Sequence, residues 1–212
     1  MNHQHALDLL SNALRRPLPG HDGFLKMSGY PRPDMDLVGR MIPPPRESAV
    51  LALIYPKVNE AHVLLMLRPQ YDGVHSGQVA FPGGRREEED SSLEDTALRE
   101  FREETGARTD GVTLLGSLSP VYIPPSRSLV TPFVGSTLEL APLDPDPREV
   151  DVLIETPLAE LLQEDILKKG DRYVQVMGRT MEVPYFDVQG HMVWGATAMM
   201  IAELRDLFRG QG

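Results

Sequence analysis

The sequence predicts an α/β/α sandwich, in which helices cover both faces of a mixed β-sheet. Three observations support this fold class. Apolar runs of strand length recur between residues 48 and 157, an amphipathic helical segment interrupts them at 92–105, and a second helical segment closes the chain at 195–208. Strand patterns that alternate with helical patterns indicate a sheet with helices packed on it.

The first 45 residues differ from the rest of the chain. Apolar residues at helical spacing predict a helix over 5–16, which "PLPG" then ends. The following segment, up to residue 45, is rich in proline and glycine and predicts an extended arm. We therefore divide the chain into an N-terminal helix with an extended arm, 1–45, and a main domain, 46–212.

The strand predictions rest on apolar runs bounded by turn residues. The runs "SAVLALIYP" and "HVLLMLR" flank the polar "KVNEA", which predicts a hairpin, and "GQVAFPGG" predicts a short strand that ends in a turn. Serines at the start of 92–105 and a glycine at its end are typical helix caps. Further strands are predicted at 112–118, 129–138, 149–157, 181–188 and 191–194, and a short helix at 157–167.

Composition excludes several classes of protein. The 212 residues include no cysteine, which excludes disulfides, thiolate zinc sites and cysteine nucleophiles. A net charge of −10 argues against nucleic acid polymers as partners, because phosphate backbones need a basic surface. The chain shows neither a signal-peptide pattern nor an apolar run long enough for a membrane span, so we expect a cytoplasmic protein with no membrane partner.

The segment 81–107 concentrates negative charge, with nine carboxylates against four arginines. On a helix, Glu100, Glu103 and Glu104 share one face because they stand at i, i+3 and i+4. Like charges at this spacing cost roughly 0.2–0.5 kcal/mol per pair. A solvated acidic face is the simplest interpretation of such a helix. The paired glycine directly upstream favours a metal site instead, because carboxylates and a backbone carbonyl are the ligands that Mg²⁺ or Mn²⁺ prefers.

The string from Gly84 to Ala107 resembles the signature of the Nudix hydrolases, G-x5-E-x7-R-E-U-x-E-E-x-G-U, in which U is apolar. The second half of this signature is matched by Arg99, Glu100, Phe101, Glu103, Glu104, Gly106 and Ala107. In the first half, Asp90 replaces the glutamate, and eight residues rather than seven separate it from Arg99. The resemblance implies a Nudix-type sandwich and a metal-dependent attack of water on a diphosphate linkage.

The resemblance also implies roles for individual residues. A Mg²⁺ or Mn²⁺ ion would be held by Gly84, Glu100, Glu103 and Glu104, and the catalytic residues would be Glu103 and Glu104, one of which accepts the proton of the attacking water. Asp90 and Arg99 would form an ion pair that fixes the loop to the helix, with Gly106 closing the motif. Spacing alone equally allows Arg99 to form an ordinary surface pair with Glu103.

The longer loop and the segment upstream of it resemble the coenzyme A pyrophosphatase branch of the family, whose pattern is L-L-T-x-R-S-x3-R-x3-G-x3-F-P-G-G. The matching positions are Leu64, Leu65, Arg68, Gly77, Phe81, Pro82, Gly83 and Gly84. Met66 and Pro69 depart from the pattern, and Gly73 stands where its second arginine is expected. This glycine removes a guanidinium that could bind phosphate through two hydrogen bonds.

Three residues of this segment are candidate substrate ligands. Arg68 could contact the phosphates, or it could be a strand-end arginine that reaches into water. His75 and Gln78 could contact the substrate, or they could hold their loop together. The leading hypothesis is hydrolysis of coenzyme A or acyl-CoA to 3′,5′-ADP and (acyl-)phosphopantetheine.

Two other functions stay open. The substrate could be another nucleoside diphosphate derivative, such as a nucleotide sugar or a dinucleotide. Alternatively, the chain could be a non-catalytic Nudix module that binds a nucleotide. In each case the partner is a small nucleoside diphosphate compound, and formation of a homodimer stays open.

Overall fold

The structure is a computed structural model that describes the backbone of residues 1–210 and the side chains of 1–20 and 23–210. The last two positions of the predicted main domain lie outside the described residues. No helix in the described part of the chain is long and apolar enough to cross a membrane.

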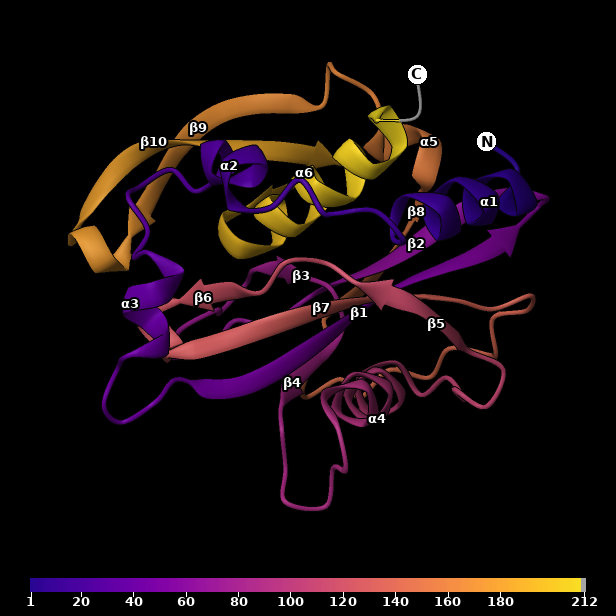
Figure 1. Cartoon of the computed structure of the whole chain (residues 1–212), viewed down its shortest axis with the longest axis horizontal. Coiled ribbons are helices and arrows are strands. Elements are labelled where there is room, and N and C mark those ends of the chain that lie inside the picture. The colour runs from indigo at the N-terminus through magenta and orange to yellow at the C-terminus, as the bar shows by residue number, and fades with distance from the viewer. Residues whose placement is uncertain (211–212) are drawn as a thin grey trace.

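A long strand, β1 (Arg46–Lys57), organises an eight-stranded mixed sheet (Figure 1). It runs parallel to β7 along one edge, whereas the other described ladders of the sheet are antiparallel. The other strands are β2 (Glu60–Leu67), β3 (Val79–Ala80), β4 (Gly83–Arg85), β5 (Thr113–Ser117), β6 (Val121–Ile123), β7 (Ser128–Ser136) and β8 (Val152–Pro157). The predicted mixed sheet is therefore confirmed.

Both faces of the sheet are buried. Side chains alternate along each strand, so successive residues of β1 pack on opposite faces. Leu51 and Leu53 of β1 pack on one face against α4 (Leu93–Thr105). Ala52 and Ile54 face the opposite way, toward α1 (His3–Ala13) and α6 (Gly195–Arg209). Figure 1 shows α4 on one side of the sheet and α1 and α6 on the other. The expected α/β/α sandwich is confirmed.

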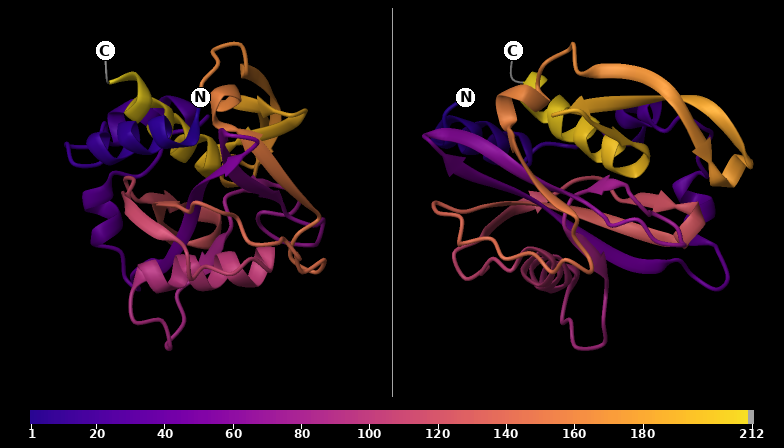
Figure 2. Two further views of the ribbon diagram at one scale, coloured as in Figure 1. Left: turned by 90° about the vertical axis from the view of Figure 1, so that its right-hand side faces the viewer. Right: turned by 180° about the vertical axis from the view of Figure 1, so that it is seen from behind.

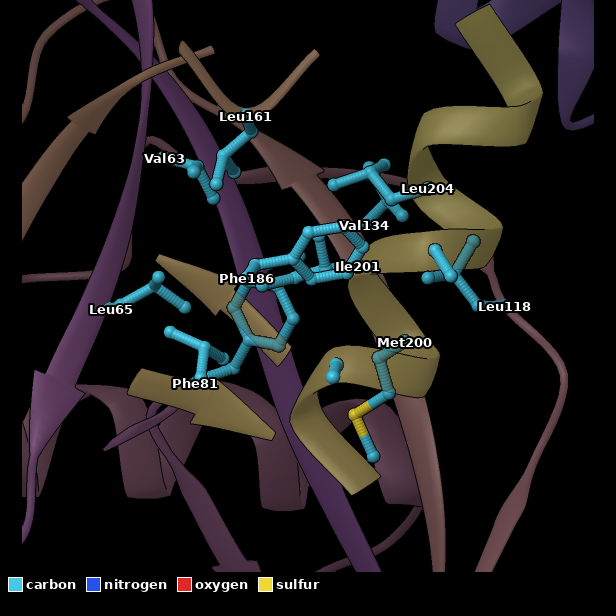
Figure 3. Packing of buried hydrophobic residues seen from close by; sticks show 14 of the residues in the cluster. Val63, Leu65, Phe81, Leu118, Val134, Leu161, Phe186, Met200, Ile201 and Leu204 are labelled. Atoms are coloured by element: carbon cyan, nitrogen blue, oxygen red, sulfur yellow. The ribbon is translucent and has the colours of Figure 1, made fainter. Parts of the chain in front are cut away.

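A second sheet covers α6 on its far side (Figure 2). It has three antiparallel strands, β9 (Leu167–Val174), β10 (Arg179–Val188) and β11 (His191–Trp194). Phe186 of β10 and Ile201 of α6 pack with Leu65 and Val134 of the main sheet (Figure 3). Both sheets therefore share one core. The sequence did not predict β9.

The N-terminal arm packs against this core rather than extending from it. It contains α1, α2 (His21–Phe24), a 3₁₀ turn η1 (Leu25–Met27) and α3 (Met35–Gly39). Ala6 and Leu10 of α1 are fully buried in the main core. The buried Glu203 of α6 accepts hydrogen bonds from the backbone N–H of Gly20 and from both donors of Ser119. This carboxylate ties the arm to the sheet, while the domain division at residue 45 stays a prediction.

The predicted hairpin and the helix at 92–105 have nearly the expected bounds, whereas the predicted short helix is shorter. The β1–β2 hairpin turns through Val58 and Asn59, both of which have positive φ angles, as a two-residue turn requires. The Ser92 hydroxyl caps α4 by accepting from the Asp95 N–H. The short helix expected at 157–167 covers only α5 (Leu158–Leu161). Two further 3₁₀ turns are η2 (Pro124–Ser126) and η3 (Gln175–Met177).

Candidate active site

The paired glycines bring β4 unusually close to its neighbours. Gly83 has a φ of 153°, and a Cβ atom there would lie 2.5 Å from the Cα of Val50. A Cβ on Gly84 would lie 2.5 Å from both carboxylate oxygens of Glu100. Only glycine fits at Gly83, whereas a side chain at Gly84 would displace the Glu100 carboxylate, so the backbone of β4 lies directly beside the acidic face of α4.

Helix α4 holds its three glutamates at different depths. Phe101 packs into the core and anchors the helix. As a result, the side chain of Glu104 is 2% exposed, that of Glu100 15% and that of Glu103 49%. The helix ends at Gly106, which has a φ of 71°. The acidic face is therefore a graded set of carboxylates, from fully buried to half-exposed.

Glu104 is held by the paired glycines of β4, which we call the glycine turn, and by the residue that follows β2. It accepts a 2.7 Å hydrogen bond from the Gly83 N–H and forms a 3.0 Å ion pair with Arg68. Arg68 also donates to the carbonyl oxygen of Gly83 at 2.9 Å. Burial raises the pKa of Glu104 to about 7, although Arg68 and the Gly83 N–H oppose this effect. Arg68 is thus a partner of Glu104 as well as a candidate phosphate ligand.

Arg99 joins the loop before α4 to the acidic face. Its Nε and Nη2 atoms each donate to Asp90 at 2.9 Å, and its Nη1 atom contacts Glu100 and Glu103 at 3.0 Å. The Asp90 pair and the Glu103 surface pair, which the sequence offered as alternatives, therefore coexist. The Arg99 guanidinium holds the pKa of Asp90 well below its ordinary value.

These arginines change the interpretation of the acidic cluster. The spacing on the helix favoured a cation as the partner of this cluster, yet each of the three glutamates already contacts an arginine, Glu104 through Arg68 and the other two through Arg99. In the described part of the chain, no three acidic or histidine side chains form a ready-made metal site.

The donor set nevertheless fits a hard divalent cation. Glu100, Glu103 and Glu104 offer only oxygen ligands, and the missing side chain of Gly84 leaves its backbone directly against Glu100. These four residues would hold the ion.

A cleft of about 1180 Å³ opens beside this site, on the sheet face opposite α4. Its walls come from β1, β7, the loop between β2 and β3, the second sheet and the N-terminal arm. Four arginines line the cleft, and no described aspartate or glutamate does; the arginines are Arg32, Arg68, Arg85 and Arg172. Such a lining attracts an anion into a protein whose net charge is −10.

His75 and Gln78 both line the cleft. They also contact each other, with the His75 Nδ1 atom 3.2 Å from the Gln78 Oε1 atom. His75 has a φ of 72°, and burial lowers the pKa of its imidazole. The pair therefore holds its own loop, as one interpretation of the sequence expected, and both residues line the cleft.

Sequence reasoning missed several residues of the site. Tyr30 and Arg32 belong to the arm, and Arg172 lies on the unpredicted β9, yet all three line the cleft. Glu149 is also new: burial is the main cause that raises the pKa of Glu100 and Glu104, and the charge of Glu149 raises both further. None of these residues belongs to a local pattern, so a single sequence carried no signal for them.

The family follows from a match to known proteins. A family model described as "NUDIX domain" matches residues 45–175, more than half of the chain. The chain belongs to the Nudix hydrolase family. It is therefore an enzyme, as its signature implied, and enzymes of this family generally need a divalent metal ion.

Curated relatives of this Nudix hydrolase carry a family name without a substrate. A protein of Photorhabdus laumondii named "Uncharacterized Nudix hydrolase NudL" is 36% identical over 180 residues, which cover 80% of this chain and 94% of that protein. A Yersinia pestis protein of the same name is 35% identical over 159 residues, 75% of this chain and 78% of the relative.

Among solved structures, RenU, a Nudix hydrolase from M. smegmatis, matches with a TM-score of 0.54 at 19% identity, over 79% of this chain and 88% of that one. This likeness shows the fold alone.

Proposed function

We propose that this Nudix hydrolase cleaves the diphosphate linkage of coenzyme A or acyl-CoA, giving 3′,5′-ADP and (acyl-)phosphopantetheine. The observation that carries the proposal is the cleft lined by four arginines and no described carboxylate, whose wall includes Arg68, Gly83 and Gly84, the residues that contact Glu104 and Glu100 of α4. The sequence pattern from Leu64 to Gly84, which resembles the coenzyme A branch, supports the choice of substrate.

The cleft suits a large anionic nucleotide. Tyr30, Tyr71, Tyr173 and Trp194 line it together with the arginines, and aromatic faces can stack on a nucleobase. Gly73 lies in the wall in place of the branch's second arginine. Arg172 approaches from β9 and forms no ion pair with a described carboxylate. We infer that Arg172 supplies the positive charge that Gly73 lacks.

The reaction adds water across the anhydride. The water oxygen bonds to one phosphorus atom, the bridging oxygen leaves with the other phosphate, and one proton of the water passes to a carboxylate. We assign that acceptor role to Glu103 or Glu104, which stand on the acidic face. A bound Mg²⁺ or Mn²⁺ would neutralise diphosphate charge and lower the pKa of the attacking water. Glu100 and the Gly84 carbonyl would complete its ligand set.

Arg68 has two tasks in this proposal. It orients Glu104 through their 3.0 Å ion pair, and it stands in the cleft where it can donate to a phosphate oxygen. His75 and Gln78 shape the adjacent loop and are proposed to contact the substrate. A cytoplasmic location stays a prediction from the sequence, and formation of a homodimer stays open.

The test is a substrate panel assayed with Mg²⁺ and with Mn²⁺. Coenzyme A and an acyl-CoA should give higher kcat/KM values than a nucleotide sugar or a dinucleotide. Glu104→Gln should lower kcat by roughly 10²–10⁴-fold while the fold is retained, because glutamine can still accept from the Gly83 N–H. Glu94→Gln, an exposed position on the same helix, is the matched control and should be unchanged. If a nucleotide sugar ranked first, the coenzyme A assignment would be wrong, whereas an active Glu104→Gln would remove the catalytic assignment.

A further inference from the structure

Arg32 is an arginine of the cleft for which the family signature gives no role. Its Nε atom donates to the Ser28 hydroxyl at 2.8 Å, and its Nη1 atom donates to the Tyr122 carbonyl at 2.9 Å. The guanidinium carbon lies 4.3 Å from the centre of the Tyr30 ring. These contacts fix the plane of the guanidinium and leave its Nη2 atom without a hydrogen bond to a described residue.

No described carboxylate balances the charge of Arg32. The ion pairs of the described side chains involve other arginines and lysines, including Arg68 of the same cleft. Burial lowers the pKa of Arg32, the direction expected for a cation that lacks a counter-charge, and Tyr30 only partly offsets this effect. A half-buried cation without a counter-charge is costly, so its presence in a ligand cleft points to an anionic ligand.

The position of Arg32 is set by the register of the main sheet. Arg85 of β4 pairs with Ser48 of β1, Ser48 pairs with Val130 of β7, and Val130 pairs with Val121 of β6. Arg32 is bound to Tyr122, the residue that follows Val121. Three strand spacings, about 14 Å, therefore separate the backbone of β4, which carries the glycine turn, from the strand that anchors Arg32.

This separation distinguishes Arg32 from the diphosphate site. Arg68 and Gly84 adjoin the acidic face of α4, where the scissile diphosphate is proposed to bind. Arg32 approaches the same cleft from the other end, on a segment outside the 45–175 range that the family model matches. A guanidinium held in one plane matches a phosphate group, to which it can donate in a fixed geometry.

We propose that Arg32 binds a phosphate monoester that the substrate carries apart from its scissile diphosphate, and so selects phosphorylated nucleotides over their dephosphorylated forms. This rests on the proposed function, since the 3′-phosphate of coenzyme A is such a group. The arm thereby contributes to substrate specificity as well as to the core. Tyr30 and Ser28 act as positioning residues that orient the guanidinium.

The experiment compares pairs of substrates that differ by one phosphate. The pairs are coenzyme A with dephospho-coenzyme A, and ADP-ribose 2′-phosphate with ADP-ribose. The intact enzyme should prefer the phosphorylated member by roughly 10–100-fold in kcat/KM, the range expected for hydrogen bonds to a charged group. Arg32→Gln should abolish this preference by raising KM for the phosphorylated member alone, and Arg32→Lys should retain part of it.

Arg127→Gln is the matched control. Arg127 also ties the arm to the turn after β6, through a 2.8 Å hydrogen bond to the Pro43 carbonyl, but it is exposed and does not line the cleft. It should leave the preference unchanged. If Arg32→Gln lowered the Tm and reduced kcat/KM equally for both substrates of a pair, the role of Arg32 would be structural. That result would overturn the proposal.

A measurement on the unaltered enzyme covers the case in which Arg32→Gln does not fold. As a product-like inhibitor, 3′,5′-ADP should bind more tightly than AMP by a similar factor, and equal inhibition would refute the role of Arg32. If neither coenzyme A compound is cleaved, the proposed substrate is wrong, and the ADP-ribose pair and the inhibitors still decide the role of Arg32.

Discussion

Replacing Asp90 with asparagine should destabilise the protein by about 3 kcal/mol. Four donors converge on this carboxylate: the Nε and Nη2 atoms of Arg99, the Glu87 N–H and the Thr96 hydroxyl, at 2.9–3.0 Å. The side chains of Asp90 and Arg99 are only 4% and 15% exposed. Removing one partner of a buried pair costs roughly 3–5 kcal/mol. We take the lower value because Arg99 keeps Glu100 and Glu103 as counter-charges.

The assay is urea denaturation of the wild type and Asp90→Asn, with Tm as a second readout. For a chain of this size, the loss corresponds to a Tm lower by about 6–12 °C. The midpoint should fall while the slope of the free energy of unfolding stays constant. Asp110→Asn, which removes one partner of an exposed ion pair with Arg108, should cost less than about 1 kcal/mol. A cost for Asp90→Asn as small as that of the control would refute the reasoning.

The pH dependence of this difference gives a second check. Because Arg99 lowers the pKa of Asp90 in the folded state, the pair stabilises the protein above the ordinary pKa of an aspartate. The stability difference between wild type and Asp90→Asn should therefore be constant from pH 5 to 8 and shrink below about pH 4. A difference that grew on acidification would contradict this sign.

Two further predictions concern the glycine turn and the arm. Gly84→Ala places a Cβ atom 2.5 Å from the Glu100 carboxylate and should lower kcat by roughly 10–100-fold, while Gly39→Ala, whose Cβ would meet nothing within 4 Å, should leave kinetics unchanged. Glu203→Gln weakens the three hydrogen bonds that hold Gly20 and Ser119, so we expect a loss of about 2 kcal/mol in the free energy of unfolding and faster tryptic cleavage of the arm. Unchanged cleavage would show that this carboxylate does not secure the arm.

Much of the fold was predictable because its strands carry a strong local signal. The strands β1 and β2 are buried on both faces and therefore read as continuous apolar runs. The strand β9 has the sequence LKKGDRYV and is largely exposed along its length. An exposed edge strand of this kind has neither an apolar run nor an alternating pattern, so its position depends on pairing with β10, which only the tertiary structure provides.

The residues of the candidate site also differ in how well the sequence predicts that they come together. The three glutamates and Arg99 lie on α4, so helical geometry brings them together whatever the rest of the chain does. Asp90 stands in the loop just before this helix, within 15 residues of Glu104. The contact of Arg68 with Glu104 depends on the order of the strands in the sheet. Arg32 is a single arginine in a proline-rich segment, and nothing in its neighbourhood along the chain indicates that it lines the cleft.

The arginines beside the acidic face have a consequence for the resting enzyme. Because guanidinium groups already contact each of the three glutamates, part of the repulsion on this face is relieved before any inorganic ion binds. A divalent cation must then compete with the arginines for the carboxylates, which weakens the net affinity of the site for the cation. Turnover would in this way follow the supply of free divalent ions in the surroundings.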